Sequence, residues 1–96
     1  MNLQAIREKW KDEIFRLGEK HGARNIRVFG SMARNEEGSK SDLDLLVDME
    51  KGRSYLDLVG FWQDVEALLV CRVDVISERG ISPYLQDEIR KDAIPL

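Results

Sequence analysis

One short segment of the chain fixes a strand, a tight turn and the start of a helix in that order. A largely apolar run at residues 26–29 predicts the strand, and it ends at Gly30 and Ser31. Gly30 has no Cβ, so another group can approach the backbone closely, and Ser31 can cap a helix opened by Met32. The unbonded N–H groups of a strand-to-helix turn favour a bound anion.

A pair of carboxylates follows this turn. Asp42 and Asp44 begin a run, residues 42–47, that alternates acidic with apolar residues and then becomes wholly apolar, as in a central strand. Alternation places both carboxylates on one face, with Cα atoms about 6.6 Å apart, so both can converge on a hard cation. Asp48 has the same parity, but about 20 Å of strand separates it from Asp42. We interpret Asp48 as a solvated residue at the strand end.

A third acid, Asp74, lies in a β-branched run at residues 72–76. Its neighbours predict burial, and a buried carboxylate needs a cation, a hydrogen-bond donor or a metal. If its strand lies beside the Asp42 strand, the three acids can surround one or two magnesium ions. The alternative is an ion pair with Arg72 or Arg34. Beside the turn and the acidic pair, the metal site is the hypothesis that we favour.

Length and charge restrict the class of protein. We expect the 96 residues to form one domain, residues 1–96, with little room for a separate substrate-binding module. The net charge is −3 and the isoelectric point is near 5.2, which argues against a broad surface for nucleic acid. A basic protein face or a metal–nucleotide is the partner that this charge favours.

The remaining chemistry is sparse. Cys71 is the only cysteine, so neither an intrachain disulfide nor a cysteine zinc cluster can form, and we expect a small buried thiol. His21 is the only histidine, and we interpret it as a capping or surface residue at a helix end. No apolar run approaches the roughly 18 residues of a membrane span, and the polar start has no signal peptide. A soluble protein of the reducing cytoplasm is expected.

The periodic segments predict an α/β fold with helices packed on a small sheet. Residues 2–21 predict one amphipathic helix, and Ser54 with Asp57 predicts a capping box for a second helix over residues 55–69. Ser82 and Pro83 begin a last helix that ends before Pro95. The first helix is expected to bury the stripe Leu3, Ile6, Trp10, Ile14 and Leu17. The second is expected to bury Tyr55, Leu58, Val59, Trp62, Val65 and Leu69, with Trp62 in the core rather than stacked on a nucleotide base.

Gly30-Ser31, ten residues, and Asp42-x-Asp44 together resemble the minimal nucleotidyltransferase family, a group within the polymerase-beta-like nucleotidyltransferase superfamily. Ala33-Arg34 and Ser41 belong to the same pattern. Asn35 stands where the family often has glycine, and asparagine tolerates left-handed backbone geometry. The resemblance covers nearly the whole chain. It implies a small mixed sheet with the polymerase-beta-like fold, and transfer of a nucleotide as the reaction.

For that reaction the residues suggest definite roles. Asp42 and Asp44 would hold magnesium, or manganese, with the triphosphate of ATP, and Asp74 would complete the metal site or take the proton of the acceptor hydroxyl. Gly30 and Ser31 would bind the β- and γ-phosphates. Arg34 would neutralise phosphate charge, because its planar donors match phosphate oxygens and the family pattern includes it. Lys40, in the polar loop at residues 35–40, is the alternative cation, and this loop is expected to move until nucleotide binds.

The resemblance also implies an acceptor. Family members of this size, of the MntA type, act as antitoxins that modify a tyrosine of a HEPN-domain ribonuclease toxin, and an external protein acceptor fits the absence of a substrate domain. Aminoglycoside-modifying enzymes share the motif but usually carry an added domain. The competing hypothesis is a non-enzymatic binding module that neutralises its partner by contact alone.

Overall fold

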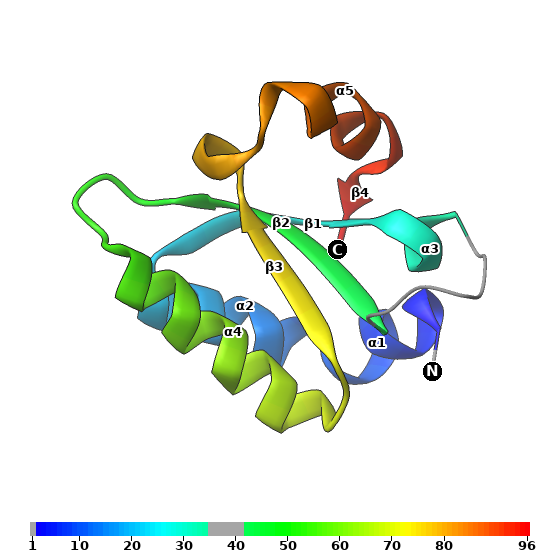
Figure 1. Cartoon of the computed structure of the whole chain (residues 1–96). Coiled ribbons are helices and arrows are strands. Elements are labelled where there is room, and N and C mark those ends of the chain that lie inside the picture. The colour runs from blue at the N-terminus through cyan, green and yellow to red at the C-terminus, as the bar shows by residue number, and fades with distance from the viewer. Residues whose placement is uncertain (1, 35–41) are drawn as a thin grey trace.

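The computed structural model describes residues 2–34 and 42–96, and within them one four-stranded sheet carries helices on both faces (Figure 1). The elements run α1 (Leu3–Lys9), α2 (Lys11–His21), β1 (Ala23–Phe29), α3 (Gly30–Ala33), β2 (Leu43–Met49), α4 (Tyr55–Leu69), β3 (Val73–Ser77), the 3-10 turn η1 (Glu78–Gly80), α5 (Pro83–Asp92) and β4 (Ile94–Pro95). The strand order is β3-β2-β1-β4, with β2 and β3 parallel and the other pairs antiparallel. The predicted α/β class with a small mixed sheet is confirmed.

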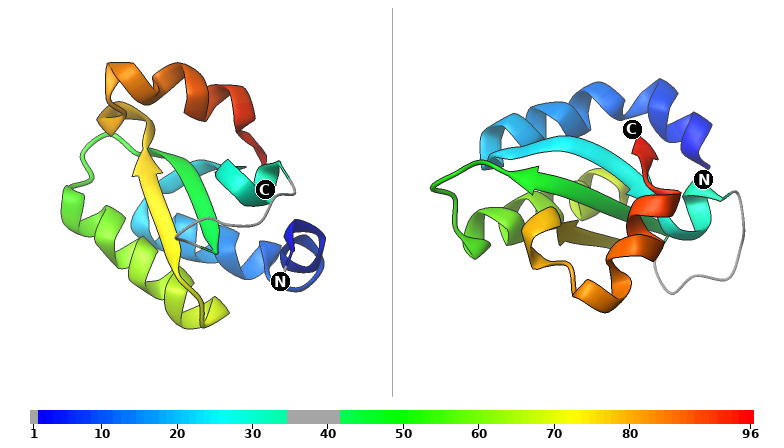
Figure 2. Two further views of the ribbon diagram at one scale, coloured as in Figure 1. Left: turned by 45° about the vertical axis from the view of Figure 1, so that its right-hand side comes forward. Right: turned by 90° about the horizontal axis from the view of Figure 1, so that it is seen from above.

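The two faces of the sheet have different covers. Figure 2 shows α5 on the opposite side of the sheet from α2 and α4. Leu43, Leu45 and Val47 of β2 belong to the larger core with the α2 and α4 side chains, whereas Leu46 packs with Ile89 of α5. Alternation therefore places Asp44, two residues before Leu46, on the α5 face.

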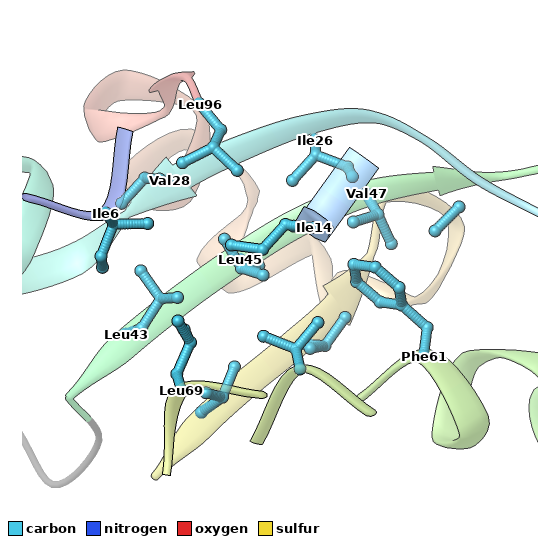
Figure 3. Close-up of a cluster of buried hydrophobic side chains, with 14 of the residues drawn as sticks. Ile6, Ile14, Ile26, Val28, Leu43, Leu45, Val47, Phe61, Leu69 and Leu96 are labelled. Atoms are coloured by element: carbon cyan, nitrogen blue, oxygen red, sulfur yellow. The ribbon is translucent and has the colours of Figure 1, made fainter. Parts of the chain in front are cut away.

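The large core fills the space between β2 and the helices α2 and α4 (Figure 3). Ile14, Leu45, Val47 and Phe61 are completely buried there. Residues 43–47 are all buried, as expected for a central strand covered on both faces. This rigid strand carries Asp44 at its beginning.

The single helix predicted for residues 2–21 is wrong in one respect, because the helix is interrupted at Trp10. Trp10 has φ −124° and ψ −10° and serves both as the end of α1 and as the residue before α2. The Trp10 N–H still donates to the Ile6 carbonyl, and the Trp10 carbonyl accepts from Ile14 N–H, so Trp10 is bonded to both helices. Of the predicted stripe, Ile6 and Ile14 are buried, and the other three side chains pack against the core half-buried.

Helix α4 has the predicted bounds, and both hydrogen bonds of the Ser54–Asp57 capping box are present. Its buried stripe differs from the prediction: Phe61 is buried, and Tyr55 is exposed. Tyr55 lies in the first turn, where it lines a groove with Ser77 and Gly80 at the end of β3 instead of the core. Trp62 packs against the core and donates its indole N–H to the Val73 carbonyl, so its structural role is confirmed.

Helix α5 begins at Pro83 after the Ser82 cap and ends before Pro95, as predicted. The turn η1 and the two-residue strand β4 were not predicted, since neither is long enough to show a period. In the described part of the chain no helix has both the length and the apolar character needed to cross a membrane.

Candidate active site

Three segments meet at one end of the sheet. Phe29, the last residue of β1, lies opposite Asp44 near the start of β2, and Asp74 lies beside Asp44 in the parallel register of β3. Because β1 runs antiparallel to β2 and β3 runs parallel to it, the end of β1 and the beginnings of β2 and β3 share one edge. The structure thereby brings the Gly30 turn together with Asp44 and Asp74.

Asp44 is buried, with 7% of its surface exposed, and its carboxylate lies directly against Gly30. Gly30 has φ +74°, and a Cβ built there would lie 2.3 Å from Oδ2 of Asp44. No side chain fits at that distance, and the positive φ also favours glycine. From the sequence, the missing Cβ of Gly30 is expected to let a phosphate approach the backbone. The structure adds that it makes room for the Asp44 carboxylate.

Asp42 lies one residue before β2, which begins at Leu43 rather than at Asp42 as predicted. It is exposed, and its backbone N–H donates to the Arg72 carbonyl at 2.9 Å. Its Oδ2 accepts from the Arg72 N–H at 3.3 Å. These bonds fix Asp42 to the turn that leads into β3.

Asp74 is exposed, so the prediction of a buried carboxylate is wrong. Strand β3 is an edge strand of the sheet. On the face that carries Asp74, the cluster that includes α5 covers Leu46 of β2 and Ile76 of β3, each two residues beyond the acid on its strand. Among the described residues, no ion pair joins Asp74 to Arg72. Arg34, the other partner considered for Asp74, pairs with Asp92 of α5. Asp74 faces solvent at the same end of the sheet as Asp44.

The donor set fits a hard cation, because three carboxylates at one sheet edge supply the oxygen ligands that Mg²⁺ prefers. Within residues 2–34 and 42–96, however, no group of three His, Cys, Asp or Glu side chains is arranged to hold a metal ion. Asp44 and Asp74 occupy adjacent positions in the register, whereas the Asp42 carboxylate is turned to the Arg72 N–H.

The predicted cap at Ser31 is wrong, because α3 begins one residue earlier. Phe29 is the residue before the helix, and Ser31 is its second residue. Arg34 caps the carboxyl end of this one-turn helix. Ser31 therefore lies near the start of α3, and Arg34 lies at its end. Predictions that concern Asn35, Lys40, Ser41 and the loop at residues 35–40 lie outside the described residues.

Beside the turn is a pocket of about 440 Å³ between α3 and α5. It is lined by Phe29, Gly30, Arg34, Glu88, Ile89, Lys91 and Asp92. The residues from α5 were missed by sequence reasoning, since about sixty residues of sequence separate them from Gly30 and no motif marks them. They bring both charges to the pocket, with the Asp92 carboxylate bound to Arg34.

The structure also places three residues that have no predicted catalytic role. Asp48 accepts from Arg27 Nη2 at 2.9 Å and from the Asn25 amide, far along β2 from Asp44. Cys71 is partly buried, and burial, followed by the charges of Asp42 and Glu66, raises the pKa of its thiol. His21 is the last residue of α2, but it neither caps the helix nor lies on the surface, because its side chain is 16% exposed and pairs with Asp64 at 2.7 Å.

The nucleotidyltransferase domain family matches residues 4–96 of the chain. A candidate protein adenylyltransferase of Methanocaldococcus jannaschii is 39% identical over 94 residues, which cover 98% of this chain and 97% of that protein. The protein adenylyltransferase MntA of Thermococcus cleftensis is 35% identical over 78 residues, covering 81% of this chain and 79% of that protein.

Two solved structures share the fold. A candidate minimal nucleotidyltransferase superposes with a TM-score of 0.83 at 45% identity, covering 100% of this chain and 97% of the other. A toxin–antitoxin solved with AMP-PNP superposes with a TM-score of 0.71, covering 88% of this chain and 69% of the other, and at 20% identity this likeness shows the fold alone. The chain therefore belongs to the nucleotidyltransferase domain family and is an enzyme of the minimal, MntA type.

Proposed function

We propose that residues 1–96 form a minimal nucleotidyltransferase that moves AMP from ATP to a hydroxyl of a partner protein in a magnesium-dependent reaction. The favoured acceptor is a tyrosine of a HEPN-domain toxin, which makes this protein an antitoxin of the cytoplasm. The observation that carries the proposal is the shared sheet edge, where the Gly30 turn lies beside Asp44 and Asp74.

Asp42, Asp44 and Asp74 are the residues that would hold the magnesium. Magnesium, or manganese, would neutralise the charge of the triphosphate and polarise the phosphorus–oxygen bond that breaks. Asp44 is suited to a fixed ligand because its strand is buried on both faces. Asp74 is suited to contact an incoming acceptor because it is exposed, and its carboxylate would complete the metal site or accept the hydroxyl proton.

Phosphate recognition is assigned to the turn and to α3. The Gly30 and Ser31 backbone and the Ser31 hydroxyl would contact the β- and γ-phosphates. Arg34 already ends in the pocket beside Gly30, where it is paired with Asp92. Phosphate oxygens would share or replace that carboxylate as acceptors for the guanidinium.

The related proteins support a protein acceptor and an adenine nucleotide. Two relatives that align over most of their length are named protein adenylyltransferases. A protein of the same fold was solved as a toxin–antitoxin with AMP-PNP. Neither name specifies the amino acid that is modified, so the tyrosine and the HEPN domain belong to the proposal.

The direct test is incubation of the protein with labelled ATP, magnesium and the purified product of the neighbouring gene. Mass analysis should find one AMP on a tyrosine of that product, and excess chelator should prevent the transfer. The proposal would be contradicted if this protein neutralised the partner while the partner stayed unmodified.

The competing function is a binding module that neutralises the partner by contact. Asp74→Asn separates the two, because it keeps the side-chain volume at an exposed position but removes the charge. The enzyme hypothesis expects this variant to bind the partner with wild-type affinity and to lose both transfer and neutralisation. Full neutralisation without a covalent product would favour the binding module.

A further inference from the structure

The turn between α4 and β3, residues 70–72, contains a side chain that the fold itself does not explain. Val70 ends α4 with φ +52° and ψ +47°, in the left-handed region. Helices commonly end with glycine or asparagine in this conformation, and a β-branched residue there is strained. The Val70 side chain is also 87% exposed, so no packing within the described structure compensates for the strain.

This turn adjoins the candidate active site. The Arg72 carbonyl and N–H bind the backbone and carboxylate of Asp42, and Asp74 follows four residues after Val70. Four residues of chain span at most about 14 Å. A standard protein interface covers about 800 Å² on each partner, equivalent to a disc about 16 Å in radius. A protein that presents a hydroxyl to Asp74 therefore covers Val70 as well, if it approaches from the open edge of β3.

Other large apolar side chains on the described surface lie elsewhere. Tyr55 and Leu56 are in the first turn of α4, and the fifteen residues of that helix separate them from Val70 by about 20 Å. Tyr84 and Leu85 begin α5, at the opposite end of that helix from Asp92 and the Gly30 pocket. Phe15, which is 38% exposed, lies within α2. Among the exposed large apolar residues of the described structure, Val70 is thus the one in the turn that is bonded to Asp42.

The charge around the turn indicates the chemistry of the partner. Two carboxylates flank it: Asp42 is bound to the Arg72 backbone, and Glu66 Oε2 accepts from the Val73 N–H at 3.2 Å. Among the described residues of this group, Arg72 is the cation. An excess of negative charge attracts a basic protein face, and the chain as a whole carries −3.

We propose that Val70 and the turn at residues 70–72 form the docking surface for the acceptor protein. An apolar side chain of that protein packs on Val70, and basic residues beside it face Asp42 and Glu66. The inference rests on the proposed function, and it names the surface by which the acceptor reaches the site.

The test uses Val70→Asn, because asparagine accepts left-handed geometry and removes the apolar contact. Leu56→Gln is the matched control, since it removes an equally exposed apolar side chain at the far end of α4. The probe is the purified product of the neighbouring gene. We expect the melting temperature and the ATP affinity of Val70→Asn to equal or exceed those of the wild type, since the exposed side chain contributes no packing.

Against this background Val70→Asn should raise the KM for the partner, and the Kd for the partner without ATP, about tenfold, with little change in kcat. Leu56→Gln should leave both unchanged. A KM and a Kd of Val70→Asn within about twofold of the wild type would overturn the docking surface. Failure of the wild type to transfer AMP would instead count against the proposed function, and the Kd comparison would still decide the docking surface.

Discussion

At the scale of single residues, the contact between Gly30 and Asp44 links backbone geometry to chemistry. The glycine is needed twice, for its positive φ and for the space that the Asp44 carboxylate fills. A motif that the sequence associates with phosphate thus also positions an acid. Glycine at position 30 therefore serves both the backbone conformation of the turn and the packing of the buried Asp44 carboxylate on the neighbouring strand.

Gly30→Ala should therefore lose activity as well as stability. A left-handed alanine costs about 1 kcal/mol or slightly more, and the new Cβ would displace Asp44. Gly52→Ala is the control, because Gly52 has φ +91° but no atom within 4 Å of its built Cβ. Chemical unfolding should show a loss in both variants, larger in Gly30→Ala because its Cβ also displaces the buried Asp44, and a transfer assay should show a loss in Gly30→Ala alone. Equal activity in the two would refute the Asp44 contact.

Ser31→Ala tests phosphate recognition by a single hydroxyl. The loss of one charge-assisted hydrogen bond should weaken ATP binding by about 1–3 kcal/mol, measured by calorimetry. Ser82→Ala is the comparison, since the Ser82 hydroxyl caps α5 and its loss should lower stability by about 1 kcal/mol without changing ATP affinity. Unchanged affinity in Ser31→Ala would remove Ser31 from the site.

At the scale of elements, the sequence predicts helices and strands that have a clear apolar period and capping residues at their ends. It does not predict short irregularities or features that depend on contacts between distant segments. The bounds of α4 follow from the Ser54–Asp57 box and the apolar period, and both were visible in the sequence. The interruption at Trp10 was not predictable, because no glycine or proline marks it in the sequence. The exposure of Asp74 depends on the place of β3 at the sheet edge, which local sequence does not contain.

Helices α2 and α4 are joined by His21 and Asp64, and this pair predicts a pH dependence. The hydrogen bond from His21 is the main cause that lowers the pKa of Asp64 below its ordinary value of 3.8. A lowered pKa in the folded state means that the ionised carboxylate stabilises the fold above pH 3.8 and that this contribution is lost as the pH falls through the folded pKa. Asp64→Asn should therefore be destabilised in urea at pH 7 and should approach the wild type near pH 2. A constant difference across this range would contradict the assignment.

At the scale of the whole molecule, the sheet joins distant segments into one site. Asp44 and Asp74 come from two parallel strands, and Asp42 comes from the residue before β2. The turn follows the antiparallel strand β1, and α5 lines the far side of the pocket. The sequence predicted the acids and the turn because their motif is local. It did not predict Lys91 and Asp92, because their position depends on how α5 folds back over the sheet.

The central claim is that carboxylates at this edge of the sheet are needed for transfer of AMP, and Asp44→Asn tests it most directly. Asp48→Asn is the matched control, four residues along the same strand, where the side chain pairs with Arg27 away from the site. The measurement is the rate at which AMP appears on the partner protein by intact mass, with magnesium and ATP saturating. We predict a loss of about 100-fold or more in Asp44→Asn and a rate near wild type in Asp48→Asn. A folded Asp44→Asn protein that transfers AMP at the wild-type rate would contradict the account.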